Sequence, residues 1–377
     1  MVVPVRSAVA GLPVYRPGKP APDVPGLITY KLSSNENPYP PLPGVLAATA
    51  EGVAQMNRYP DLANAAMTEA VAARLGVSGD QLAFGTGSVA VLYQLLQAVC
   101  EPGDEVIYAW RSFEAYPIAV QLTGATSVPV PLAPGAVHDL VAMREAVTPA
   151  TKVIMLCTPN NPTGPAIDHE GVLDLLDAVP DHVLVIIDEA YVEFVRKPDA
   201  VRGLEALAGR PNVVVLRTFS KAYGLAGFRV GYCVADPRLA SAVRAVSLPF
   251  GVSVAAQAAV IASLAAEDAL FKRVETLVDA RDRLAAGLRD RGLAVPDAQG
   301  NFIWLPAGTR TAEYEGVFAR AGLIVRAYVA GDTGDGLRIT VGEPEANARV
   351  LDVAAGLARR PDPALPRAVR RIVGMSD

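Results

Sequence analysis

The chain has 377 residues, which exceeds one ordinary domain of about 100–200 residues, so we expect two domains or one large domain with additions. Its 34 Lys and Arg residues against 39 Asp and Glu residues give a formal net charge of −5, so no overall basic excess favours nucleic acid or an anionic membrane. Hydrophobic residues make up 51% and charged residues 19%, a composition that excludes a disordered chain.

The sequence carries no sign of a membrane span, an export signal or a disulfide framework. The best candidate span, Val252–Ala266, is shorter than the ~20 apolar residues required and contains polar side chains, so we expect a buried helix. The N-terminus lacks the charged-then-apolar order of a secretion signal. Cys100, Cys157 and Cys233 are far apart and odd in number. We therefore expect a soluble, cytoplasmic protein, and the spacing of the histidines predicts no metal site.

The first forty residues are predicted to form an extended arm, because ten of the 31 prolines lie between Pro4 and Pro43. An apolar face with helical spacing follows, from Val45 to Met56. Beyond it, β-rich runs alternate with helical stretches such as Ser88–Cys100 and His169–Ala178, which predicts an α/β fold with a mostly parallel, doubly wound, seven-stranded sheet. The expected strands are Leu82–Phe84, Glu105–Tyr108, Thr126–Val130, Val153–Leu156, Val183–Ile187, Val213–Leu216 and Val230–Val234.

The pattern changes after about Asp236 and predicts a smaller α+β domain. An amphipathic stretch from Leu270 to Leu288 predicts a long helix that ends at Gly292. Three short strands are expected after it, and the tail from Arg359 is expected to be loosely attached. These strands are Phe302–Leu305, Leu323–Val325 and Leu337–Val341. The predicted division is 1–43 for an N-terminal arm and part of the small domain, 44–238 for the large domain and 239–377 for the small domain.

Chemically useful groups follow four of the expected strands of the large domain. Ligands bind outside the carboxyl ends of the strands in a doubly wound sheet. These strand ends offer a carboxylate at Asp188, a lysine at Lys221, an amide at Asn161 and a glycine-rich helix start at Gly85–Ser88. We expect the four groups to meet at one site.

Lys221 is the strongest candidate for catalysis. It follows a buried strand in a nearly uncharged segment, and burial lowers the pKa of an amine from its ordinary value of ~10.4. A neutral amine can attack a carbonyl and form a Schiff base. A loop lysine by itself is usually solvated, but here nearby glycines permit close backbone approach, and Ser220 and Arg229 can hold a phosphate.

The segment from Ser220 to Tyr232 reads S-K-A-Y-G-L-A-G-F-R-V-G-Y. It resembles the Schiff-base lysine signature of the fold-type I, pyridoxal-phosphate-dependent aminotransferases. An Asn-Pro-Thr-Gly motif at Asn161 lies upstream, and Asp188 and Tyr191 lie between, in the order and spacing of that family. The resemblance covers about Tyr15 to Val341 and implies an aspartate aminotransferase-like fold with pyridoxal 5′-phosphate as cofactor.

The resemblance also implies a role for each matched residue. Lys221 would bind the cofactor aldehyde covalently and later move a proton between the substrate α-carbon and the cofactor. Asp188 would pair with the ring nitrogen and keep it protonated, which preserves the ring as an electron sink. Asn161 and Tyr191 would hydrogen-bond the phenolic oxygen of the ring. Lys221, Asp188 and Tyr191 are therefore the expected catalytic residues.

Four residues are expected to bind the cofactor phosphate. The side chains of Ser220 and Arg229 match the family's phosphate ligands. Backbone N–H groups of Gly87 and Ser88 would add to them at a helix start, where the helix dipole favours an anion.

Two aromatic residues complete the cofactor-binding set that the resemblance implies. Phe113 matches the residue that stacks on the pyridine ring. Tyr59 matches a tyrosine that reaches the phosphate in the neighbouring subunit, which implies a homodimer. Each single position has a simpler alternative: Asp188 could cap a helix, Asn161 could serve a turn, Phe113 could belong to the core, and Tyr59 could be an ordinary surface residue.

Arg338 lies within an otherwise apolar strand, and a buried guanidinium must be paired. A substrate α-carboxylate would pair it in a bidentate manner, and the resemblance implies this role, with Asn161 close by. A structural ion pair is the alternative. Arg326 and Tyr15 match positions that touch the distal end of the substrate in histidinol-phosphate aminotransferases.

The substrate is predicted from motifs within the family. Ser33–Pro40 resembles the histidinol-phosphate aminotransferase-like group. Within that group, Gly85–Val89, Trp110–Pro117 and Gly342–Asn347 look more like the aromatic amino acid (phenylalanine) aminotransferases. Phe113 also stands where the histidinol-phosphate enzymes more often have tyrosine. We therefore predict that an aromatic L-amino acid and 2-oxoglutarate are converted into the aromatic 2-oxo acid and L-glutamate.

Three alternatives to aromatic transamination belong to the same fold. The first is a histidinol-phosphate aminotransferase, which shares all the cofactor chemistry. The second is a pyridoxal-phosphate-dependent decarboxylase, in which Arg338 would orient the carboxylate for loss. The third is a regulator with a DNA-binding helix pair, for which the proline-rich arm leaves no room. The expected partners are amino-acid and 2-oxo-acid substrates and a second copy of the chain.

Overall fold

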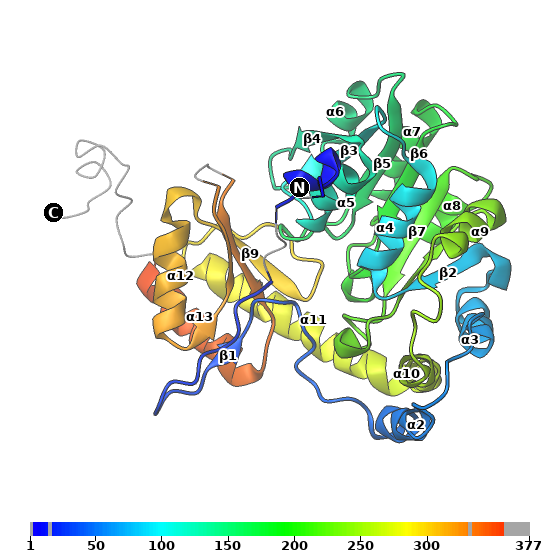
Figure 1. Cartoon of the computed structure of the whole chain (residues 1–377). Coiled ribbons are helices and arrows are strands. Elements are labelled where there is room, and N and C mark those ends of the chain that lie inside the picture. Colours follow the sequence, from blue (N-terminus) through cyan, green and yellow to red (C-terminus); the bar gives the residue numbers. More distant parts are fainter. Residues whose placement is uncertain (1–2, 14–16, 331–333, 358–377) are drawn as a thin grey trace.

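A seven-stranded sheet is the largest layer of the protein (Figure 1). The computed structural model describes residues 3–13, 17–330 and 334–357. The strands of this sheet are β2 (Leu82–Gly85), β3 (Glu105–Trp110), β4 (Thr126–Pro131), β5 (Thr151–Cys157), β6 (Leu184–Asp188), β7 (Val213–Thr218) and β8 (Gly231–Val234). Their order is β2-β8-β7-β6-β5-β3-β4. Strand β8 is antiparallel to both its neighbours and the other pairs are parallel, so the predicted mostly parallel sheet is confirmed.

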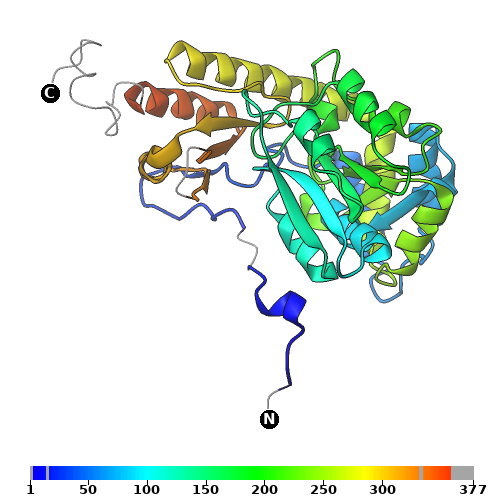
Figure 2. The ribbon, with the colours of Figure 1, turned by 90° about the horizontal axis from the view of Figure 1, so that it is seen from above.

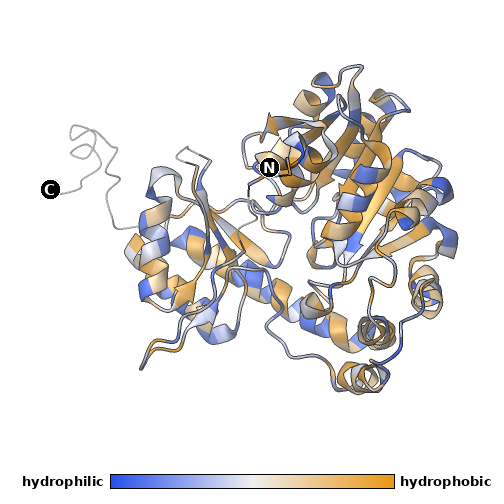
Figure 3. Cartoon of the chain, viewed as in Figure 1, coloured by the Kyte–Doolittle hydropathy of each residue, from blue (hydrophilic) through white to orange (hydrophobic). Residues whose placement is uncertain are grey.

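Helices cover both faces of this sheet, as the continuously apolar strands predict. In β3, Val106 belongs to one buried cluster and Ile107 to the cluster on the opposite face, as the period of two requires. Figure 3 shows these strands as largely apolar bands. The first cluster contains residues of α4 (Ser88–Val99), α5 (Ala115–Thr123) and α9 (Pro237–Ala245), and the second those of α6 (Leu140–Glu145), α7 (His169–Ala178) and α8 (Gly203–Leu207).

Three further helices pack beside β2 and β8 and contribute to one buried cluster. They are α2 (Pro43–Val53), α3 (Ala65–Leu75) and α10 (Val254–Ala265). Helices α2 and α10 approach closely, since a Cβ atom on Gly52 would lie 3.1 Å from Cα of Ala255. The predicted helical face from Val45 to Met56 is too long, because the helix ends at Val53 and Met56 is exposed.

The apolar stretch near residue 260 forms a buried helix, as predicted. Within the described ranges, no single helix is long and apolar enough to cross a membrane. Helix α10 and the following helix α11 (Glu267–Asp290) pass the length and composition test together, and they meet at an 82° bend.

The C-terminal part forms a three-stranded antiparallel sheet with its own core. Its elements are α11, β9 (Phe302–Pro306), α12 (Thr311–Arg320), β11 (Arg326–Tyr328), β12 (Gly336–Thr340) and α13 (Pro344–Leu357). Figure 2 shows α11 and α13 side by side, and their buried residues join those of β9 and β12. Helix α11 closes as predicted at Gly292, whose φ of 79° lies in the left-handed region.

The predicted strand Leu323–Val325 is present and one residue shorter, and the separate strand that follows it was missed. Leu323 and Ile324 form β10, which pairs in parallel with β1 (Tyr30–Lys31) from the N-terminal arm. Arg326–Tyr328 forms β11, which belongs to the other sheet and pairs with β12. Two short strands that belong to different sheets leave no distinct periodicity in the sequence.

The predicted domain boundary at residue 238 remains a prediction, and it lies within α9. Ala240 and Val243 of α9 share a buried cluster with the large sheet, and so do Ala256 and Val260 of α10. We propose instead that the large domain extends through α10 and that the small domain begins with α11.

The remaining short helices are α1 (Ser7–Ala10), η1 (Gly79–Gln81), η2 (Val192–Phe194), η3 (Ala226–Phe228) and η4 (Gly308–Arg310).

Candidate active site

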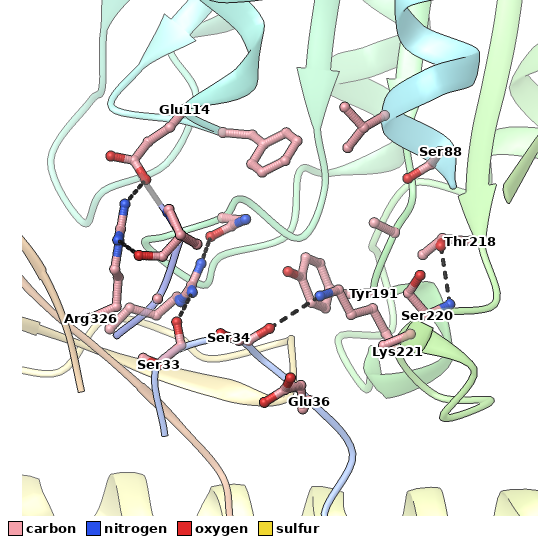
Figure 4. Close-up of a pocket in the computed structure, with 18 of the residues that line it drawn as sticks. Ser33, Ser34, Glu36, Ser88, Glu114, Tyr191, Thr218, Ser220, Lys221 and Arg326 are labelled. Atoms are coloured by element: carbon pink, nitrogen blue, oxygen red, sulfur yellow. Dashed lines mark hydrogen bonds and ion pairs between the residues drawn. The ribbon is translucent and has the colours of Figure 1, made fainter. Parts of the chain in front are cut away.

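A cavity of about 300 Å³ lies between the carboxyl ends of β5–β7 and the strands β11 and β12 (Figure 4). The last residues of the three parallel strands, Cys157, Asp188 and Thr218, line it together. Its position is the one expected for a ligand site in a doubly wound sheet. The sequence-predicted residues that line it are Ser88, Phe113, Asn161, Asp188, Tyr191, Ser220, Lys221, Arg229, Arg326 and Arg338.

Lys221 points into this cavity from the loop after β7. Its Nζ donates a 3.4 Å hydrogen bond to the backbone oxygen of Ser34 and lies 5.6 Å from the centre of the Tyr191 ring. Burial, helped by the positive charges of Arg338 and Arg229, lowers the pKa of Lys221 to about 7. A large fraction of this amine is therefore neutral near pH 7 and can act as a nucleophile.

Asp188 is the last residue of β6 and is almost fully buried. Its Oδ2 accepts a 2.8 Å hydrogen bond from the hydroxyl of Tyr116, and its Oδ1 accepts one of 3.3 Å from the backbone N–H of Ala190. Burial raises the pKa of Asp188 to about 6 in spite of these bonds. A cation against this carboxylate, such as a protonated ring nitrogen, would favour its ionised form.

Arg338 faces the cavity from β12 and donates hydrogen bonds to two uncharged oxygens. Its Nη1 donates a 2.6 Å hydrogen bond to Oδ1 of Asn161, and its Nη2 donates one of 2.7 Å to the backbone oxygen of Ser33. Its buried Nε has no partner among the described residues. These contacts do not form the structural ion pair considered as the alternative, and they leave a buried cation for a substrate carboxylate to neutralise.

A corner suited to an anion lies at the start of α4. Gly87 has a φ of 90°, and a Cβ atom there would lie 2.3 Å from Nη2 of Arg229. Nη1 of Arg229 donates a 3.2 Å hydrogen bond to Oγ of Ser220. The first turn of α4, which begins at Ser88, adds unpaired backbone N–H groups. Guanidinium, hydroxyl and helix start together form a phosphate-binding arrangement.

Tyr59 does not reach the cavity within this chain. Tyr59 is 81% exposed, and its ring stacks on Phe250 with 4.6 Å between the ring centres. Tyr15 lies outside the described residues. Tyr59 therefore takes no part in the site of its own chain.

Several residues of the site were missed from the sequence. Tyr116 holds Asp188, and Nδ2 of Asn35 donates a 2.9 Å hydrogen bond to the hydroxyl of Tyr191. Glu114 lines the cavity and pairs with Arg326. Tyr116 lies three residues after Phe113, in line with one helical turn, which is a signal that was available. Asn35 comes from the proline-rich arm, where no local pattern indicates a contact with the segment after β6.

The fold and the site define a class of enzymes. Residues 28–353 match the family model "Aminotransferase class I and II", so the chain belongs to this family. The family uses pyridoxal 5′-phosphate, and the predicted aminotransferase resemblance is confirmed.

The comparisons also identify particular relatives. The chain is 54% identical over 349 residues to "Aromatic amino acid aminotransferase" of Streptomyces avermitilis, which covers 93% of this chain and 96% of the relative. Histidinol-phosphate aminotransferase from Sinorhizobium meliloti, solved with pyridoxal-5′-phosphate, is 30% identical with a TM-score of 0.80 and covers 87% of this chain and 90% of that one. A single mutant of Thermus thermophilus aspartate aminotransferase has the same fold, with a TM-score of 0.76, 24% identity and coverage of 88% and 92%.

The described residues fit pyridoxal 5′-phosphate on structural grounds. A side chain at Gly87 would clash with the guanidinium of Arg229, so this glycine lets the cation lie against the start of α4, where a phosphate would be held. Lys221 supplies an amine with a pKa of about 7 in the same cavity. Asp188 supplies a buried carboxylate in the lining of the same cavity that a ring nitrogen could neutralise.

Proposed function

We propose that this enzyme transfers the amino group of an aromatic L-amino acid to 2-oxoglutarate in a ping-pong reaction with pyridoxal 5′-phosphate. The observation that carries the substrate class is the 54% identity, over nearly the whole chain, to an aromatic amino acid aminotransferase. The cavity agrees, because the rings of Phe113, Tyr191 and Tyr328 and the side chain of Val89 line it.

Lys221 and Asp188 are the proposed centre of the reaction. The bound cofactor supplies an aldehyde that takes up the amino group and an electron-withdrawing ring. Lys221 holds the cofactor covalently between turnovers and, once released, carries the proton to and from the substrate α-carbon. Asp188 holds a proton on the ring nitrogen, and Tyr116 orients and stabilises its carboxylate. Tyr191, whose pKa is raised by burial, keeps its hydroxyl proton as a donor.

The other residues fix the orientation of cofactor and substrate. Ser220, Arg229, Gly87 and the N–H of Ser88 hold the phosphate. Arg338, with Asn161 on one side of its guanidinium, binds the α-carboxylate of the amino acid. Phe113 would stack on the cofactor ring, and its own ring packs edge-on against Tyr116 of α5, with 5.7 Å between the ring centres.

Steady-state kinetics test the substrate class. The purified holoenzyme is assayed with phenylalanine, tyrosine and histidinol phosphate, each against 2-oxoglutarate. We expect kcat/KM for phenylalanine or tyrosine to exceed that for histidinol phosphate by at least about tenfold, some 1.4 kcal/mol of transition-state preference. A tenfold preference for histidinol phosphate would refute the proposal.

Histidinol phosphate is the second candidate substrate, because the solved relative from Sinorhizobium meliloti is a histidinol-phosphate aminotransferase and is 30% identical. The steady-state kinetics described above distinguish the two candidate substrates. The higher identity of 54% to the aromatic enzyme favours the first candidate.

We also propose that the enzyme works as a homodimer in which Tyr59 reaches the phosphate of the partner's cofactor. Tyr59, Leu62 and Leu248 are large apolar residues, each more than half exposed, around a hollow of about 530 Å³ that Leu62, Leu248 and Phe250 line. Sedimentation analysis of Leu248→Asp should show a shift toward monomer. Val141→Asp, which changes another apolar residue that is more than half exposed, on α6, should leave the assembly unchanged.

The proposed location is the cytoplasm. All three cysteines are free and buried, which is typical of a protein from a reducing compartment. Cell fractionation of the source organism, with activity assayed in each fraction, tests this location.

A further inference from the structure

Two arginines face each other across the small sheet in the wall of the cavity. Arg326 of β11 is the register partner of Arg338 of β12, so their side chains share one face of the sheet. Their guanidinium carbons lie 5.6 and 5.8 Å from the centre of the same ring, that of Tyr328. Both arginines line the cavity, and two like charges placed in this way repel each other unless an anion lies nearby.

The two arginines differ in what they bind. Arg338 donates hydrogen bonds to two uncharged oxygens, Oδ1 of Asn161 and the backbone oxygen of Ser33. Nη2 of Arg326 donates a 2.7 Å hydrogen bond to Oε2 of Glu114, and its Nη1 donates one of 2.8 Å to the backbone oxygen of Pro17. Figure 4 shows Glu114 reaching Arg326 from the opposite wall, at the end of the cavity away from Lys221. The chain itself therefore neutralises one of the two cations.

The charge of the acidic group on a substrate decides what such a pair can bind. A phosphate monoester carries about −1.5 to −2 charges at pH 7 and three acceptor oxygens, which suits two adjacent arginines. A carboxylate carries one charge and suits one arginine. With Glu114 on Arg326, the pair retains one uncompensated positive charge.

We propose that Glu114 is a specificity-determining residue that makes the enzyme accept an acidic group of one charge and reject a phosphate monoester. Its carboxylate occupies Nη2 of Arg326, a donor that a phosphate would need, and it repels the second negative charge of the phosphate. This assignment rests on the proposed aromatic transamination, because it explains how the same cofactor site excludes histidinol phosphate.

The test compares the ratio of kcat/KM for histidinol phosphate to kcat/KM for phenylalanine in wild-type holoenzyme and in Glu114→Gln. Glutamine keeps the shape of the side chain and removes its charge, and Glu114 is partly exposed, so the fold is expected to persist. We expect this ratio to rise by about tenfold or more. Inorganic phosphate should also inhibit Glu114→Gln at a lower concentration than it inhibits the wild type.

Three further variants make the result specific. Glu36→Gln removes a different carboxylate from the lining of the same cavity, one that pairs with Lys31, and should change the ratio by less than about twofold. Adding Arg326→Gln to Glu114→Gln should cancel the gain, because the released cation is then absent. Glu114→Ser, which also lacks the charge, provides a second variant should the glutamine variant not retain its cofactor.

The outcomes separate this inference from the proposed function. If the wild type prefers phenylalanine but the ratio does not rise in Glu114→Gln and Glu114→Ser, the role of Glu114 is wrong and the proposed function stands. An equal rise in Glu36→Gln would also overturn the inference, since any lost carboxylate would then suffice. If the wild type itself prefers histidinol phosphate, the proposed function is wrong, and so is the assignment of Glu114 that rests on it.

Discussion

The hydroxyl of Tyr116 donates a 2.8 Å hydrogen bond to Oδ2 of Asp188 deep inside the molecule. Tyr116 lies on α5 and Asp188 at the end of β6, and both are buried. This bond favours the ionised carboxylate against the larger effect of burial, which raises the pKa of Asp188 to about 6. Tyr116 is therefore a positioning residue that acts through Asp188.

Tyr116→Phe should raise the pKa of Asp188 further. The loss of a hydrogen bond worth about 1 kcal/mol corresponds to roughly 0.7 pH unit. The acidic limb of the pH profile for cofactor binding by apoenzyme should move to higher pH by this amount, with a smaller change at pH 8. Tyr108→Phe is the matched control, because it removes the hydroxyl of another buried tyrosine. The ring centres of Tyr108 and Tyr116 lie 6.0 Å apart. Equal shifts in both variants would contradict the assignment.

Lys221→Ala should keep the fold and lose covalent attachment of pyridoxal phosphate together with turnover. In the wild type, the rate of attachment to apoenzyme should rise with pH and reach half its plateau near pH 7, because the neutral amine is the nucleophile and burial lowers the pKa of Lys221 to about 7. Borohydride reduction followed by mass spectrometry measures attachment. A rate that stays constant from pH 6 to pH 9 would count against this role.

Asp188→Asn should stabilise the apoenzyme at pH 8. Burial raises the pKa of Asp188 from 3.8 to about 6. The folded state therefore binds a proton more tightly than the unfolded state, and this contribution to stability is lost as pH rises from about 4 through 6. The shift corresponds to roughly 3 kcal/mol at most. Chemical denaturation of both apoenzymes should show a gain of about 1–3 kcal/mol at pH 8 and little difference at pH 4. The same variant should bind the cofactor more weakly.

Arg338→Gln should lower kcat/KM for phenylalanine by about 100-fold or more, because the loss of one partner of a buried charge pair costs about 2–5 kcal/mol. Phenylethylamine has the same ring but no carboxylate, so any half-reaction with it should change far less. Arg338→Lys should recover little activity, since an ammonium cannot replace the bidentate contact. A similar loss with both compounds would show that Arg338 acts on the fold and not on the carboxylate.

The sequence by itself determined the chemistry at the strand ends. The apolar runs of β5, β6 and β7 are local patterns, and the polar residues after each run are fixed in place by chain continuity. The loop from Ser220 to Arg229 carries a lysine, a hydroxyl and a guanidinium within ten residues, so its motif is readable without the fold. The meeting of Lys221 and Asp188 in one cavity then follows from the rule that parallel strands end at the same edge.

Tertiary structure alone decided the contacts between distant segments. Arg338 reaches Asn161 across 177 residues, and Arg326 reaches Glu114 across 212. These pairs form because β11 and β12 face the large sheet across the cavity, and no period or motif within one segment encodes that approach. The division of residues 323–328 between two sheets has the same origin, because strand pairing depends on the partner strand and not on the two or three residues of the strand itself.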